Sequence, residues 1–162
     1  MRPLVALYAS QPFPAGWSQQ VGYSGFVATH LEISKRVHEG VVILDLKGRL
    51  VLGDASLAVR ERTSEEAAQG NSKVILNLEQ VDHIDSTGLG SMVICFTSLQ
   101  RTGGALKLLK LNRRNLELLV LTKLSTVFEI FNEEQDAINS FFPDRKIKRF
   151  DILSFVQQKE KE

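Results

Sequence analysis

Two patterns of hydrophobic and polar positions alternate along the chain. Short apolar runs rich in branched side chains are typical of strands, and longer segments with an apolar residue every three or four positions are typical of helices. Strands are predicted at residues 31–37, 41–46, 74–78, 105–109 and 127–131. Helices are predicted at about residues 54–69, 87–101, 112–124 and 132–142. The order is therefore β-β-α-β-α-β-α-β-α.

This order predicts one domain of the α/β class. Glu39 and Gly40 form a turn between the first two strands, which indicates an antiparallel hairpin. Strands that alternate with helices indicate parallel neighbours joined by right-handed crossovers. The helices are expected mainly on one face of the sheet. The first helix is expected to be capped by Asp54 and, with its thin apolar side, to cover one flank of the sheet.

Residues 1–29 differ from the rest, because they hold three of the four prolines, the tryptophan, both tyrosines and a single charge. They are expected to be a loosely ordered extension. Two alternatives stay open: an arm that docks on a neighbouring subunit through its aromatic residues, which would make a homodimer, or translation from a misassigned start codon. Residues 143–162 form a charged C-terminal extension with interspersed apolar residues. This second extension could form an amphipathic helix that packs on its own domain, frays or meets a partner.

The overall composition excludes several classes of protein. Hydrophobic residues make up 43% of the chain and charged residues 24%, which is ordinary for a globular domain. The net charge of +1 lacks the basic bias of a nucleic-acid-binding surface, so no direct nucleic-acid contact is expected. Every apolar run is too short to span a bilayer, and the single cysteine cannot form an intrachain disulfide. We therefore expect a cytoplasmic protein that does not insert into membranes.

Residues 81–90, which join the third predicted strand to the second predicted helix, carry the main candidate site. Asp85, Ser86 and Thr87 can each cap the helix by accepting a hydrogen bond from a free backbone N–H group. Gly88 and Gly90 leave the backbone at the start of the helix uncluttered. The pattern predicts an exposed tip with hydroxyl groups at the positive end of a helix, where anions are favoured.

The run Asp85-Ser86-Thr87-Gly88-Leu89-Gly90, preceded by Ile75-Leu76-Asn77-Leu78, resembles the signature of the STAS domain of bacterial anti-sigma factor antagonists. The resemblance extends in pattern over roughly residues 31–142. It implies a mixed sheet of about five strands flanked by about four helices, in agreement with the pattern. It also implies a STAS domain at residues 30–142 between the two extensions, 1–29 and 143–162.

The resemblance implies a phosphorylation-switched binding module without catalytic activity or cofactor. Ser86 occupies the position of the family's regulated serine, and Thr87 is a second, less favoured acceptor. Asp85 caps the helix or helps to position the hydroxyl group, and residues 85–90 form the loop that binds the partner. The unphosphorylated form would bind an anti-sigma factor that is also a serine kinase, and so free a sigma factor. Phosphorylation of Ser86 would end that binding, and a phosphatase would reset it.

Two other classes of function stay open. Some STAS domains resemble accessory subunits or scaffolds of membrane transporters or stress-signalling complexes, in which Ser86 would only cap its helix. An enzyme is least supported, because His30, His38 and His83 are isolated in the sequence. Cys95 lies within an apolar helical pattern and is expected to be a small buried side chain. No metal site can be assembled from these residues.

Overall fold

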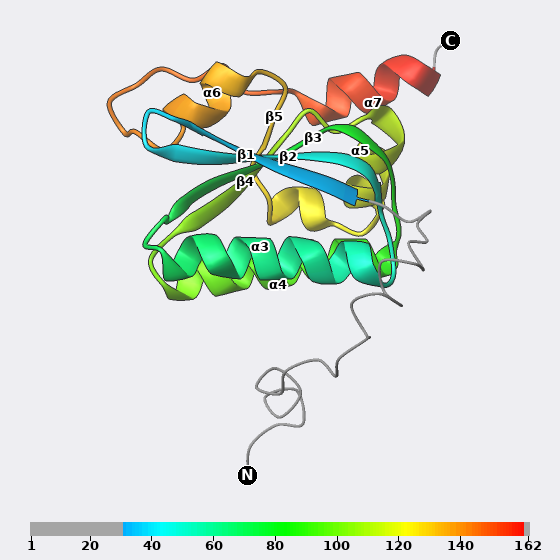
Figure 1. Ribbon diagram of the computed structural model, residues 1–162. Coiled ribbons are helices and arrows are strands. Elements are labelled where there is room, and N and C mark those ends of the chain that lie inside the picture. The colour runs from blue at the N-terminus through cyan, green and yellow to red at the C-terminus, as the bar shows by residue number, and fades with distance from the viewer. Residues whose placement is uncertain (1–30, 161–162) are drawn as a thin grey trace. The chain divides into compact units, whose positions relative to one another are not determined.

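The structure, a computed structural model, describes residues 31–160. The extension predicted at residues 1–29 lies outside this range. The strands are β1 (Leu31–His38), β2 (Val41–Leu50), β3 (Lys73–Ile84), β4 (Ala105–Leu109) and β5 (Ile130–Phe131). The helices are α3 (Asp54–Ala68), α4 (Ser86–Arg101), α5 (Arg113–Leu121), α6 (Glu134–Asn139) and α7 (Ile152–Glu160), with a short 3-10 helix η2 (Leu124–Thr126), as Figure 1 shows.

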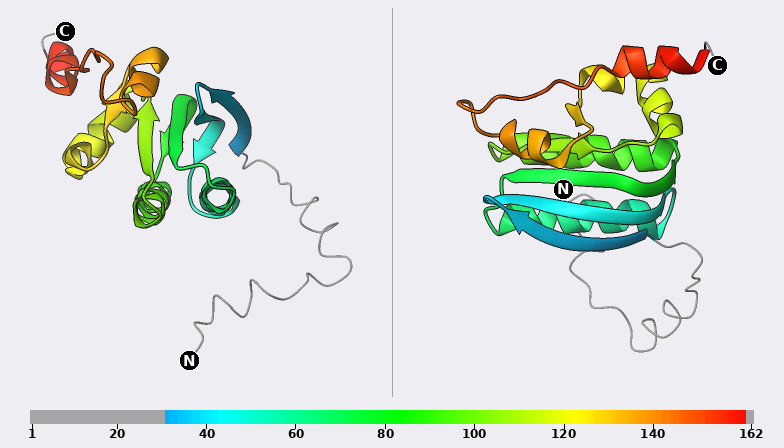
Figure 2. Two further views of the ribbon diagram at one scale, coloured as in Figure 1. Left: turned by 90° about the vertical axis from the view of Figure 1, so that its left-hand side faces the viewer. Right: turned by 90° about the horizontal axis from the view of Figure 1, so that it is seen from above.

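The five strands form one mixed sheet in the order β1-β2-β3-β4-β5. β1 is antiparallel to β2, and every later pair is parallel, so the predicted hairpin and parallel neighbours are confirmed. Each parallel crossover moves one strand further in the same direction. Right-handed crossovers of this kind place their helices on one face of the sheet, and Figure 2 shows α3 and α4 together on that face.

The sheet separates two hydrophobic clusters. The larger lies under the crossover helices and includes Val42, Leu44 and Met92. The smaller lies on the opposite face, where α6 packs through Ala137 and Ile138. α6 follows the last strand and makes no crossover, so the handedness rule leaves it free to occupy the second face. Burial on both faces explains why the central strands read as continuous apolar runs.

Several predicted boundaries were wrong. β2 continues to Leu50 and β3 to Ile84, so residues 81–84 belong to a strand and not to the connection. The two strands remain paired up to Leu50 and Ile84, across register shifts. The hydrogen bonds between them therefore continue each strand beyond its apolar run. β5 is only Ile130–Phe131, so the strand predicted at residues 127–131 was too long. The helix predicted to reach residue 124 ends as α5 at Leu121, and residues 124–126 form η2.

The predicted Asp54 cap was also wrong. Gly53 is the N-cap of α3, with φ 105° and ψ −139°, and no side chain makes a capping hydrogen bond there. This positive φ favours glycine, which places Asp54 in the first helical turn. Its carboxylate there still interacts favourably with the helix dipole. α3 does cover one flank of the sheet as predicted, through a narrow buried side that includes Ala55 and Val59.

The charged C-terminal extension contains α7, which packs on the domain. Phe150, Ile152, Phe155 and Val156 are partly buried against the main core. Arg113 of α5 donates from Nη2 to the backbone oxygen of Phe155 at 3.0 Å. Its guanidinium carbon lies 5.3 Å from the centre of the Phe155 ring. Apolar contact, a hydrogen bond and a cation–π contact therefore hold α7 on α5.

Candidate functional site

The start of α4 is tied to the loop that follows β2, and Asp85 makes the connection. Asp85 is the N-cap of α4, and its Oδ1 accepts a hydrogen bond from the backbone N–H of Gly88 at 2.7 Å. Its Oδ2 accepts from the backbone N–H of Leu52 at 2.9 Å. Its own N–H donates to the backbone oxygen of Leu50 at 3.2 Å. The predicted capping role of Asp85 is confirmed, and the carboxylate also clamps a second loop.

These hydrogen bonds change the acidity of Asp85. Burial would raise the pKa of the carboxyl group, but the backbone N–H donors at Gly88 and Leu52 outweigh burial and lower the pKa below its ordinary value. Asp85 is therefore a carboxylate throughout the neutral range. This fixed negative charge lies directly before Ser86.

Of the two glycines in the motif, only Gly88 is required by the packing. A Cβ atom at Gly88 would lie 2.1 Å from the backbone oxygen of Leu50. Apart from its chain neighbours and the backbone of its own helix, no atom lies within 4 Å of a Cβ atom built at Gly90. The bare backbone at Gly88 therefore lets α4 begin against the end of β2, whereas Gly90 faces open space.

Ser86 and Thr87 are exposed in the first turn of α4. Because Asp85 makes the capping hydrogen bond, neither hydroxyl group is needed for it. Within residues 31–160, no hydrogen bond engages the Ser86 or Thr87 hydroxyl group. Leu89, which was expected in the partner-binding loop, is only 6% exposed and packs in the main core. The accessible part of the motif is thus Ser86, Thr87 and Gly90.

Exposed apolar residues near this tip were not predicted from the sequence. Leu52, whose amide is bound by Asp85, has a side chain that is 73% exposed. Ile94 lies two helical turns after Thr87 on the same side of α4 and is 45% exposed. An apolar residue directly before Gly53, in a short loop, was the available signal for Leu52. Unpaired hydroxyl groups beside exposed apolar side chains are suited to contact with another protein.

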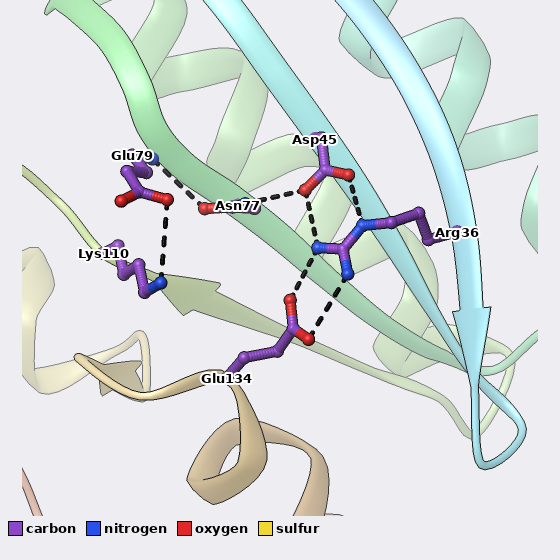
Figure 3. A network of polar contacts seen from close by, with 6 residues as sticks. All are labelled: Arg36, Asp45, Asn77, Glu79, Lys110 and Glu134. Atoms are coloured by element: carbon purple, nitrogen blue, oxygen red, sulfur yellow. Dashed lines mark hydrogen bonds and ion pairs between the residues drawn. The ribbon is translucent and has the colours of Figure 1, made fainter.

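A polar network occupies the other face of the sheet, as Figure 3 shows. Arg36 of β1 makes paired hydrogen bonds to Asp45 of β2 and to Glu134 of α6. Asn77 donates to Asp45 at 2.7 Å and accepts from the backbone N–H of Glu79 at 3.2 Å. Asn77 therefore joins β3 to β2. The network links α6 to the sheet.

Cys95 and the histidines are the remaining candidates from the sequence. Cys95 is buried, as predicted, and burial raises the pKa of its thiol. No set of three or more His, Cys, Asp or Glu side chains in residues 31–160 is placed to hold a metal ion. No described helix combines the length and apolar character needed to cross a membrane. His30 lies outside the described residues.

Comparison with known proteins places this geometry in a family. The model of the STAS domain family matches residues 32–137, which include β1 from Glu32 onward and the whole motif. The anti-sigma-B factor antagonist of Bacillus subtilis is 27% identical over 109 residues, which cover 67% of this chain and 98% of that protein. The family model ends before α7, so the C-terminal segment that packs on α5 lies outside the residues that it matches.

Solved structures agree with the sequence comparison. A Thermotoga maritima protein, provisionally called an anti-sigma factor antagonist, superposes with a TM-score of 0.63 at 28% identity. The match covers 67% of this chain and 92% of that one. The phosphorylated form of the Bacillus protein SpoIIAA has the same fold, with a TM-score of 0.54 at 22% identity over 69% of this chain and 99% of its own.

Proposed function

This chain belongs to the STAS domain family, and we propose that it is an anti-sigma factor antagonist switched by phosphorylation of Ser86. In its unphosphorylated form it binds an anti-sigma factor that is also a serine kinase, which frees a sigma factor for transcription. The kinase ends this binding by phosphorylating Ser86, and a phosphatase restores it. In this role the chain works in the cytoplasm, has no enzymatic activity and holds no cofactor, because ATP is bound by the kinase.

The observation that carries the proposal is that Asp85, and not Ser86, caps α4. Asp85 accepts the capping hydrogen bond from Gly88, so the exposed Ser86 hydroxyl group has no structural task in the described residues. A kinase can therefore phosphorylate this hydroxyl group without removing a hydrogen bond that holds the helix. Thr87 is equally exposed, and we assign it the role of a secondary acceptor.

Phosphorylation at this position is compatible with the fold. A phosphate adds between about 1.5 and 2 negative charges at neutral pH. At a helix N-terminus that charge gains about 0.3–1 kcal/mol from the dipole. The Asp85 carboxylate opposes part of this gain, since it lies directly before Ser86. The phosphorylated domain therefore stays folded, and the switch acts on binding.

The large effect of phosphorylation falls on the interface. The Leu52 amide is bound to Asp85, so the exposed residue Leu52 lies next to the Ser86 tip, where one partner can contact both. A phosphate at the centre of such a contact loses its hydration, and desolvation of an unpaired charge costs several kcal/mol. A loss of about 3 kcal/mol weakens binding by more than a hundredfold. Charge alone can therefore release the partner.

The test is a pull-down from native lysate with the full chain carrying Ser86→Ala or Ser86→Asp, followed by mass spectrometry. We expect the Ala form to retain a kinase-like ATPase and the Asp form to lose it. Ser98→Ala and Ser98→Asp are matched controls, since Ser98 is exposed on the same helix but far from its N-terminus. Both Ser98 variants should retain the partner.

A phosphorylation assay with the captured kinase and ATP then identifies the acceptor. Ser86→Ala should abolish incorporation of phosphate, and Thr87→Ala should leave most of it. Equal capture of the same partner by Ser86→Ala and Ser86→Asp would contradict the switch. It would favour the alternative in which Ser86 is an exposed residue of a transporter accessory subunit or scaffold.

A further inference from the structure

The outer edge of β1 is open in the described part of the chain. β1 is the first strand of the sheet, and its eight residues pair with β2 without a break, from Leu31 opposite Gly48 to His38 opposite Val41. Figure 2 shows it at the border of the sheet. Within residues 31–160 no strand pairs with its other side. An open strand of this length presents unpaired N–H and C=O groups to another strand.

The hairpin turn determines which backbone groups point outward. Glu39 and Gly40 have φ values of 55° and 78°, which is the conformation of a two-residue type I′ turn. The residues that flank such a turn, His38 and Val41, form a hydrogen-bonded pair, and such pairs then alternate along the ladder. The even-numbered residues of β1 thus bond to β2. The N–H and C=O groups of the odd-numbered residues point outward: Leu31, Ile33, Lys35 and Val37.

The side chains of β1 permit a second strand at this edge. Val37 is 61% exposed, although it is apolar. An inward-pointing lysine often guards an edge strand, but here the Lys35 ammonium group lies 2.9 Å from the buried Glu66 carboxylate, which neutralises it. Arg36 uses four of its five N–H groups on Asp45 and Glu134, which leaves one for a further acceptor.

From this arrangement we propose that two copies of the chain pair through the outer edges of β1, antiparallel, about a two-fold axis at Ser34. The outward groups of Leu31 then bond to those of Val37 in the second copy, and their apolar side chains meet. Glu32 faces the remaining N–H of Arg36, and no two like charges are opposite. If the two-fold axis lay at Lys35, the two Lys35 residues would be opposite each other. If it lay at Ile33, Val37 would have no partner in the ladder. Symmetry and charge therefore select the Ser34 register.

Light scattering coupled to size-exclusion chromatography of the full chain tests the dimer, and a cysteine variant tests its register. Two Ser34 residues at the axis form a non-hydrogen-bonded pair with Cα atoms about 4.5 Å apart, within the range of a disulfide. Because Cys95 is buried, Ser34→Cys adds an accessible thiol. His38→Cys is the matched control on the same side of β1, where two copies would be roughly 27 Å apart. We expect rapid disulfide linkage for Ser34→Cys only.

Val37→Pro tests the backbone pairing. Proline is tolerated on an edge strand where the N–H faces solvent, so the fold should persist by circular dichroism. Symmetry removes two hydrogen bonds at once, and self-association should weaken about tenfold or more. Val37→Thr keeps the N–H group and should retain the dimer.

A monomer at every concentration, or equal linkage of Ser34→Cys and His38→Cys, would overturn the proposal. So would a monomer that dimerises only without residues 1–29, because that segment would then occupy the edge.

Discussion

The backbone N–H of Leu52 donates to Oδ2 of Asp85 at 2.9 Å, across 33 residues of sequence. The other oxygen of the same carboxylate caps α4. One side chain therefore holds the helix that carries Ser86 and the loop that carries the exposed Leu52 in a defined relation. A partner that contacts the Ser86 tip meets a preformed surface, which reduces the entropy that binding costs.

Asp85→Asn should destabilise the domain by about 1–2 kcal/mol at pH 7. The amide can keep the cap to Gly88, but its NH2 group then faces the Leu52 N–H, and two donors cannot bond. Because the folded-state pKa of Asp85 is lowered, its stabilisation is present above the unfolded pKa, near 4, and is lost as the pH falls through the folded value. Urea unfolding at pH 7 and pH 3 should show the difference from wild type shrinking with acidification. Asp82→Asn, at an exposed neighbour, is the control.

Gly88→Ala and Gly90→Ala should change stability in opposite directions. The new Cβ at Gly88 would lie 2.1 Å from a backbone oxygen, so α4 must move, at a cost of about 1–3 kcal/mol or more. The new Cβ at Gly90 meets open space in a helix, where alanine is favoured by about 0.5–1 kcal/mol. Thermal unfolding of both variants measures this. Equal destabilisation by the two substitutions would argue against the close approach of α4 to Leu50.

Arg36→Met should remove a pH-dependent part of the stability, by about 1 kcal/mol at pH 7. The hydrogen bond from Arg36 is the main cause that lowers the pKa of Asp45, and it outweighs burial, which acts in the opposite direction. The stabilisation is therefore present above the unfolded pKa and is lost as the pH falls through the lower folded value. Both side chains are partly exposed, so solvent limits the magnitude.

Chemical denaturation of wild type and Arg36→Met between pH 7 and pH 3 checks this prediction. The two stability curves should converge as the pH falls. Arg60→Met changes an exposed position of α3, and its stability curve should run parallel to that of wild type over the same pH range. A constant gap between wild type and Arg36→Met would mean that the loss comes from packing and not from charge.

Phe155→Ala should destabilise the domain by about 1–2 kcal/mol, roughly half the cost for a fully buried phenylalanine. The substitution removes the contacts of the Phe155 ring with Arg113 and with Phe150, whose ring centre lies 5.6 Å away. Leu153→Ala is the matched control on the same helix, since Leu153 is 65% exposed and should change stability by less than about 0.5 kcal/mol. If both variants unfold like wild type, α7 does not contribute to the stability of the domain.

Much of the architecture could be predicted because it depends on local patterns. The branched apolar run at residues 74–78 indicated a central strand, and Asp85 before a helical repeat indicated a cap. The lengths of β2 and β3 could not be predicted, because residues such as Arg49 and His83 are strand residues only through their pairing with each other in the ladder. Asp54 failed as a cap because the backbone of Gly53, shaped by the loop, begins the helix one residue earlier.

The sequence by itself determined the fold class, the family resemblance and the position of the Ser86 tip, since periodicity, capping residues and a six-residue motif are local properties. Only the tertiary structure decided which motif residues are accessible. In the folded chain Leu89 is buried, Leu52 is exposed, and Asp85 binds both the start of α4 and the loop that carries Leu52. The physical reason is that burial and long-range hydrogen bonds depend on which strands and helices become neighbours. The local sequence around Leu52 and Asp85 does not indicate a contact between residues 33 positions apart.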